Sequence, residues 1–188
     1  MKNRNIIKKE NNSSIMNYEE MVFKSREEKD KFFRNHPYSP LTTEQKRKFK
    51  GLNYFEPDIS YRYEVKINKY EDQRKVSIRT SKGTAQEYIR WRYIEFERDS
   101  KTNILSVFKQ EGEDYFFIPF KDKTTGKETY SAGRYIEVEN LGDDLYLLDF
   151  NFAYNPYCAY NDNWVCPLTP FENNLEIAIE AGEKKFHE

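Results

Sequence analysis

The feature that most constrains this chain is a change in the spacing of its apolar residues near Tyr54. From there on, apolar and polar residues alternate one by one. The clearest run is 61–67, where Tyr61, Tyr63, Val65 and Ile67 alternate with Arg62, Glu64 and Lys66. Successive side chains of a strand point to opposite faces of a sheet, so this spacing predicts a strand with one buried face.

The alternation recurs along the rest of the chain, interrupted by turn signals such as Ser81-Lys82-Gly83. We expect a β-bulge near Tyr93, because the apolar residues change parity between Tyr93 and Ile94. About eight short strands predict a mainly β fold, an antiparallel β-barrel or sandwich. Beyond 61–67, the predicted strands lie around 76–78, 89–96, 105–107, 115–120, 134–138, 145–152 and 175–179.

The N-terminal part lacks this alternation, and we expect helices there. We expect residues 1–17 to form a flexible tail and residues 18–35 a helix that ends before His36-Pro37, since the residue before a proline avoids the α region. A second short helix follows, with a capping box from Thr42 to Gln45 and Gly51 just after its end. Residues 36–188 then form a single β-rich domain.

Composition excludes several classes of function. The aromatic content of 16% indicates a folded chain with an aromatic core, because disordered chains are poor in aromatics. The net charge of −1 argues against binding to nucleic acid. No apolar run is long enough to cross a membrane, and no secretory signal is visible, so we expect a cytoplasmic protein.

A hairpin is predicted around Asn140-Leu141-Gly142-Asp143-Asp144. If Val138 lies opposite Leu145, then Arg134 lies opposite Asp149 and shares a face with Asn151. This register predicts a polar site at the end of an apolar face. The alternative is an ion pair that closes the end of the domain and binds nothing.

The C-terminal third carries longer motifs. It contains Gly133-Arg134-Tyr135, Asp149-Phe150-Asn151, Ala153-Tyr154-Asn155-Pro156, Cys158-Ala159-Tyr160, Cys166-Pro167-Leu168 and Ala181-Gly182-Glu183-Lys184. With Gly51-Leu52-Asn53-Tyr54-Phe55 upstream, the chain resembles the bacterial and archaeal family called domain of unknown function 1684 over about residues 36–187. The resemblance implies that Arg134, Asp149, Asn151, Asn155, Cys158, Cys166 and Glu183 belong to the family motif, and it implies no activity. This chain departs from the family in having Ser131-Ala132 and Thr169 at positions that are often glycine and proline.

The two cysteines have several possible roles. Cys158 and Cys166 are predicted to be buried thiols that pack a loop, while a redox pair and a metal site remain alternatives. Zinc would need further ligands, such as Asp149 or Asp162, and a cysteine nucleophile would need a histidine base. His36 and His187 are the only histidines in the chain, and neither is well placed for that role.

The leading hypothesis is therefore a small-ligand-binding domain. Arg134 would bind an anionic or polar molecule, Asp149 would orient Arg134, and Asn151 and Asn155 would add hydrogen bonds. Tyr130, Tyr135, Tyr154, Tyr157 and Tyr160 would form an aromatic wall, unless they simply pack the core. One alternative is an enzyme with Asp149 and Glu183 as acid and base, although a solvated Glu183 at the end of the last strand is the simpler expectation. Another is a structural or interaction module. We expect no cofactor and no metal, and the oligomeric state is open.

Overall fold

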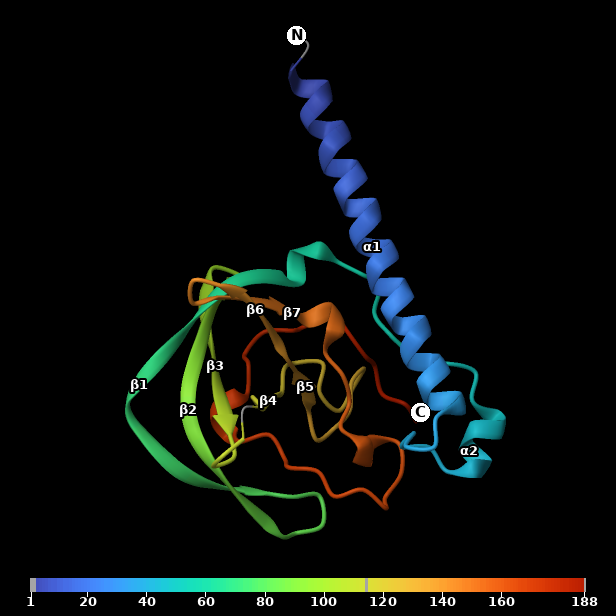
Figure 1. Ribbon diagram of the computed structural model, residues 1–188, viewed down its shortest axis with the longest axis vertical. Coiled ribbons are helices and arrows are strands. Elements are labelled where there is room, and N and C mark those ends of the chain that lie inside the picture. Colours follow the sequence, from blue (N-terminus) through green and yellow to red (C-terminus); the bar gives the residue numbers. More distant parts are fainter. Residues whose placement is uncertain (1–2, 114, 188) are drawn as a thin grey trace.

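Five antiparallel strands form the main sheet of the protein, in the order β3-β2-β1-β7-β6. The computed structural model describes residues 3–113 and 115–187. For residues 3–16 it describes the backbone alone. The strands of this sheet are β1 Arg62–Arg79, β2 Ala85–Arg98, β3 Lys101–Lys109, β6 Val138–Gly142 and β7 Leu145–Asp149. Figure 1 shows that β1, β2 and β3 curve strongly around one side of the molecule.

A second, two-stranded sheet joins β4 Ile118–Phe120 to β5 Arg134–Ile136. It lies on the concave side of the main sheet together with the C-terminal segment (Figure 1). The prediction of a mainly β protein is confirmed. Within the described residues, seven strands form two sheets, and no closed barrel is found.

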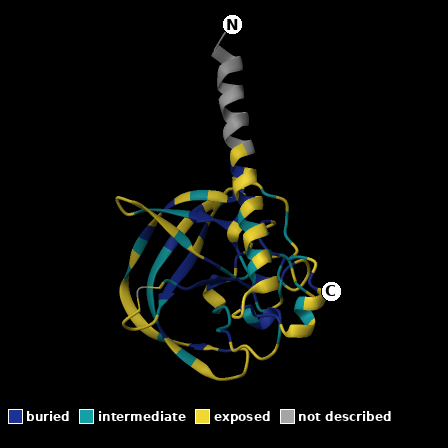
Figure 2. Ribbon diagram, turned by 45° about the vertical axis from the view of Figure 1, so that its right-hand side comes forward, coloured by how far each residue is buried: buried dark blue, intermediate teal, exposed yellow. Residues whose placement is uncertain are grey.

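The alternation of apolar residues describes the core correctly. Tyr61, Val65 and Ile67 are buried, whereas Arg62, Glu64 and Lys66 are exposed (Figure 2). The predicted bulge is also present, because the pairing of β2 with β3 shifts register between Arg90 and Arg92, close to Tyr93. The buried residues of β2, Tyr88, Ile94 and Phe96, are all even-numbered. The odd-numbered apolar residues before Ile94, which are Ile89, Trp91 and Tyr93, are only partly buried.

Two helices precede the sheets, α1 Asn3–Asn35 and α2 Thr43–Lys48. The predicted stop before Pro37 and the capping box of Thr42 and Gln45 are confirmed. The helical backbone of α1 begins at Asn3, inside the segment 1–17 that we expected to be a tail. The role predicted for Gly51 is wrong, because α2 has already ended at Lys48 with Phe49 as its C-cap. No described helix is long and apolar enough to cross a membrane.

The strand predicted at 175–179 is not formed. The apolar side chains of Leu175, Ile177 and Ile179 are buried, as the alternation requires. The segment runs extended beside residues 121–123, but only two backbone–backbone hydrogen bonds join these described stretches, from the Leu175 N–H to the Lys121 carbonyl (2.7 Å) and from the Lys123 N–H to the Ile177 carbonyl (2.9 Å). The Ile179 N–H donates instead to the Asp122 side chain (3.3 Å). Alternation therefore predicted burial correctly but not a strand ladder, because it carries no information about the partner.

Candidate functional site

The hairpin between β6 and β7 has a different register from the one expected. Val138 lies opposite Leu148 rather than Leu145, and Gly142 lies opposite Leu145. Asp143 and Asp144 have φ values of 52° and 60°, which is the left-handed conformation that suits a two-residue hairpin turn. The tight turn moves the pairing by three residues, so the predicted contact of Arg134 with Asp149 is wrong.

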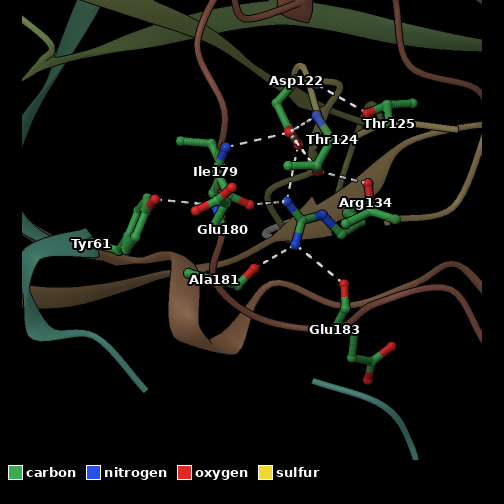
Figure 3. A network of polar contacts seen from close by, with 10 residues as sticks. Tyr61, Asp122, Thr124, Thr125, Arg134, Ile179, Glu180, Ala181 and Glu183 are labelled. Atoms are coloured by element: carbon green, nitrogen blue, oxygen red, sulfur yellow. Dashed lines mark hydrogen bonds and ion pairs between the residues drawn. The ribbon is translucent and has the colours of Figure 1, made fainter. Parts of the chain in front are cut away.

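Arg134 instead belongs to β5 and forms an ion pair with Asp122, with 2.9 Å between Nη2 and Oδ2. Figure 3 shows its guanidinium among the carbonyl groups of the C-terminal segment. Nη2 also donates to Ile179 (2.8 Å), and Nη1 donates to Glu183 (3.2 Å) and to Ala181. Burial lowers the pKa of Arg134, and Asp122 opposes that effect. The four terminal N–H groups are all used inside the protein.

Asp149 and Asn151 form a second buried cluster, which holds α1 on the β-rich part. The Tyr18 hydroxyl donates to both carboxylate oxygens of Asp149, at 2.9 and 2.7 Å. The Asn151 side chain donates to Asp149 (3.0 Å) and to the Asp58 carbonyl (2.8 Å), and it accepts from the Asp58 N–H (2.8 Å). Burial raises the pKa of Tyr18, and the Asp149 carboxylate adds to this effect.

Glu183 lies at the centre of a third cluster and is not the solvated residue that we expected. Its side chain is 1% exposed. Oε2 accepts from the Tyr160 hydroxyl (2.6 Å) and from the Asn155 N–H (2.9 Å), and Oε1 lies 2.5 Å from Lys29 Nζ of α1. Among the described residues, Glu183 and Asp149 share no hydrogen-bonding partner, so no contact links the two carboxylates that the enzyme alternative names as acid and base.

Away from these three clusters, the described residues form an aromatic cleft with a volume of about 640 Å³. We define the aromatic cleft by its lining, which comes from α1, β2, the β3–β4 connection, β5 and the segment 154–167. The lining residues that matter below are Lys29, Tyr88, Glu113, Tyr115, Phe117, Tyr135, Glu137, Tyr154, Tyr157, Trp164, Val165 and Cys166.

The rings of the cleft follow one another in contact. Tyr88 stacks on Phe117 at 5.3 Å between centroids, and Phe117 meets Tyr135 edge-on at 4.8 Å. Tyr135 in turn meets Tyr154 edge-on at 5.9 Å, with an angle of 86° between the two planes. The four rings therefore form one connected aromatic wall of the cleft.

The polar groups of the cleft are few and lie close to the rings. One oxygen of Glu137, Oε1, accepts from the hydroxyls of Tyr154 (3.0 Å) and Tyr115 (3.2 Å). The Tyr135 hydroxyl donates to the Pro167 carbonyl. Burial is the main cause that raises the pKa values of Tyr135 and Tyr154. These phenols are therefore neutral hydrogen-bonding groups at physiological pH.

The two cysteines are free thiols, both buried, as expected. The Cys158 N–H donates to Cys166 Sγ (3.3 Å), and the Tyr130 hydroxyl contacts Cys158 Sγ (3.8 Å). The hydrogen bond from the Cys166 thiol lowers the pKa of Cys158 to about 6, and the same contact raises that of Cys166. The described residues contain no group of three or more His, Cys, Asp or Glu side chains placed to hold a metal ion.

Of the predicted site residues, the structure brings Tyr135, Tyr154 and Cys166 to the aromatic cleft. Sequence reasoning missed Lys29, Tyr88, Glu137 and Trp164, which come from four separate segments. The only sequence signal for these residues was the high aromatic content of the chain, 16%. The predicted residues that do not line the cleft are Arg134, Asp149, Asn151, Asn155, Tyr130, Cys158 and Glu183.

Comparison with known proteins gives a consistent result. Residues 47–184 match the model of the family described as "Protein of unknown function (DUF1684)". The chain is also similar to an uncharacterized protein of Haloarcula marismortui solved by NMR in solution, at 39% sequence identity and a TM-score of 0.69. That similarity covers 92% of this chain and 96% of the other. No curated protein matches. The chain therefore belongs to the DUF1684 family, as its C-terminal motifs indicated.

Proposed function

We propose that the protein binds a small organic molecule in the aromatic cleft. The observation that carries this proposal is the unbroken series of ring contacts from Tyr88 to Tyr154 around an open volume of about 640 Å³. Ligand sites are typically concave and mostly apolar, with a few convergent polar groups. Glu137, with the two tyrosine hydroxyls on it, supplies those groups here.

The polar residues around Arg134 fit a structural role better. A ligand at Arg134 would have to displace carbonyl groups that hold the C-terminal segment, and no terminal N–H of Arg134 is left for it. Asp149 and Asn151 are used in the same way to hold α1 and Asp58. We therefore move the expected ligand site from Arg134, Asp149 and Asn151 to the aromatic cleft.

Trp164 provides a direct readout of binding, because it lines the cleft and is one of only two tryptophans in the chain. Replacing the other tryptophan, Trp91→Phe, leaves Trp164 as the single indole. Titration of this variant with a panel of amines, amino acids, nucleosides, organic acids and sugars is expected to change Trp164 fluorescence with one class. The same compound should raise the melting temperature of the unmodified protein, since a ligand at 100-fold its Kd adds about 2.7 kcal/mol.

A substitution that fills the cleft tests whether the ligand binds there. Val165→Trp in the unmodified protein places a large ring at the cleft from a residue that is 49% exposed, so the fold should tolerate it. It should abolish the thermal shift caused by the ligand. A matched control is Tyr38→Trp, at an exposed position outside the cleft, which should leave the shift unchanged. If the panel causes no shift, or if Val165→Trp leaves the shift intact, this proposal is wrong.

A further inference from the structure

Resting on the proposed ligand site, we infer that the molecule bound by the aromatic cleft is an organic cation that carries a methylated or quaternary ammonium group. The inference depends on the charge of the cleft, on its aromatic lining and on the ion pair that Lys29 forms with Glu183.

The cleft has more negative than positive charge. Its charged lining residues, within the part of the chain that the structure describes, are Lys29, Glu113 and Glu137. The Lys29 ammonium is already paired with the buried Glu183 carboxylate at 2.5 Å, so it contributes little positive charge toward a ligand. Glu113 and Glu137 are both exposed, and neither has an ion pair among the described residues.

Glu137 is the carboxylate next to the rings. The hydroxyls of Tyr115 and Tyr154 both donate to its Oε1, and Oε2 accepts no hydrogen bond from any described residue. A carboxylate oxygen with free acceptor capacity attracts positive charge. It repels the carboxylate or phosphate of an anionic ligand.

The aromatic lining is the second feature that favours a cation. The negative faces of aromatic rings attract ammonium groups within about 6 Å of the centroid. Tyr88, Phe117, Tyr135 and Tyr154 all line the cleft and touch one another in sequence, so an ammonium group that enters the cleft lies beside a continuous aromatic wall. The protein itself places an ammonium on this wall, since Lys29 Nζ lies 5.0 Å from the centroid of Tyr154. Methylated ammonium groups suit an aromatic lining because they present apolar methyl groups that carry diffuse positive charge.

The test compares ligands of equal shape and different charge. Choline and benzyltrimethylammonium are titrated into the Trp91→Phe protein and followed by Trp164 fluorescence and calorimetry. Each is compared with its neutral isostere, in which a carbon atom replaces the ammonium nitrogen, and benzoate serves as the anionic probe. We expect the cations to bind about tenfold more tightly than their isosteres, and benzoate not to bind.

Substitutions of carboxylates test whether the charge of Glu137 causes the preference for cations. Glu137→Gln keeps the side-chain volume and removes the charge, so it should weaken binding of the cations about fivefold and leave the isosteres unchanged. Glu139→Gln is the matched control, because Glu139 is exposed on β6 and does not line the cleft. If an isostere or benzoate binds as well as the cations, the cleft binds ligands but the inference of a cation is wrong. If no probe and no compound of the wider panel binds, both proposals fail.

Discussion

Arg134 and Asp122 form an ion pair that is completely buried, with side chains 1% and 0% exposed and 2.9 Å between Nη2 and Oδ2. Asp122 also accepts from the Thr124 N–H at 2.7 Å, and Arg134 binds the carbonyl groups of the C-terminal segment. The pair thus joins β5, the turn after β4 and residues 179–183 at one point. Removing one member leaves the other charge buried without its partner.

Arg134→Met is therefore expected to lower the free energy of unfolding by about 3–5 kcal/mol, and Asp122→Asn by a similar amount. Urea unfolding of both single variants and of the double variant gives the coupling between them. The exposed pair of Glu44 and Lys48 is the matched control, at 2.7 Å but with both side chains 76% exposed. Lys48→Met should change stability by less than about 1 kcal/mol. Equal losses at the buried and exposed pairs would contradict this interpretation.

Gly182 lies between two residues whose carbonyl groups both reach Arg134. It has a φ of +76° and lies between Ala181 and Glu183, whose carbonyls both accept from Nη1. A Cβ added at Gly182 would lie 2.6 Å from the Ala153 carbonyl oxygen and 2.7 Å from that of Phe150. Gly182→Ala should therefore cost more than the roughly 1–2 kcal/mol of left-handed backbone alone.

Gly142→Ala is the control for backbone strain without crowding. Gly142 has a φ of +91°, and an added Cβ would meet nothing within 4 Å. We expect its loss of stability to stay within about 1–2 kcal/mol. Thermal or urea unfolding of the two variants side by side checks the difference. A Gly182→Ala protein as stable as Gly142→Ala would show that the C-terminal segment can move without loss.

Stability should fall at alkaline pH, because burial raises the pKa values of Tyr54, Tyr135, Tyr154 and Tyr160 in the folded protein. The folded state favours the neutral phenols. Their contribution is complete below the pKa of about 10 of an unfolded tyrosine, and it decreases as the pH rises above that value. Tyrosinate absorbance during a pH titration should show these residues ionising only together with unfolding, as followed by circular dichroism. In urea, the same tyrosines should ionise near pH 10 without a delay.

Cys158 should react as a thiolate at neutral pH. Its pKa is about 6 because the Cys166 thiol donates a hydrogen bond to it. Alkylation of Cys158 by iodoacetamide should be slow, since the residue is 8% exposed, and its rate should reach a plateau above pH 6. In Cys166→Ala the donor is lost, so the rate should keep rising toward the ordinary pKa of about 8.5. Peptide mass spectrometry measures both profiles. Identical profiles would contradict the proposed hydrogen bond.

The fold could be predicted where one segment carries enough information by itself. The stop of α1 before Pro37 and the capping box at Thr42 depend on neighbouring residues only, and both are confirmed. The alternation in 61–67 correctly gave the buried face of β1. The same rule failed for Leu175 to Ile179, because burial of alternate residues does not require a hydrogen-bonded neighbour on each side.

The candidate site depended on pairing, and pairing was harder to predict. The register that joined Arg134 to Asp149 assumed a long connection between the strands, whereas Asp143 and Asp144 form a two-residue turn. Both residues tolerate the left-handed conformation, so the turn was a signal that could have been read from the sequence. The strand break at Glu137 was not visible, and it separates Arg134 in β5 from the hairpin.

The sequence by itself determined the mainly β character, the end of α1, the capping box of α2 and the membership of the DUF1684 family. These properties rest on local propensity, on periodicity and on long contiguous motifs. The tertiary structure alone decided that Arg134 pairs with Asp122, that Glu183 is buried under Lys29, and that rings from β2, β5 and residues 154–164 share one cleft. Those contacts join residues far apart in the chain. They depend on how the sheet curves and on which segment fills its concave side, and no single stretch of sequence contains that information.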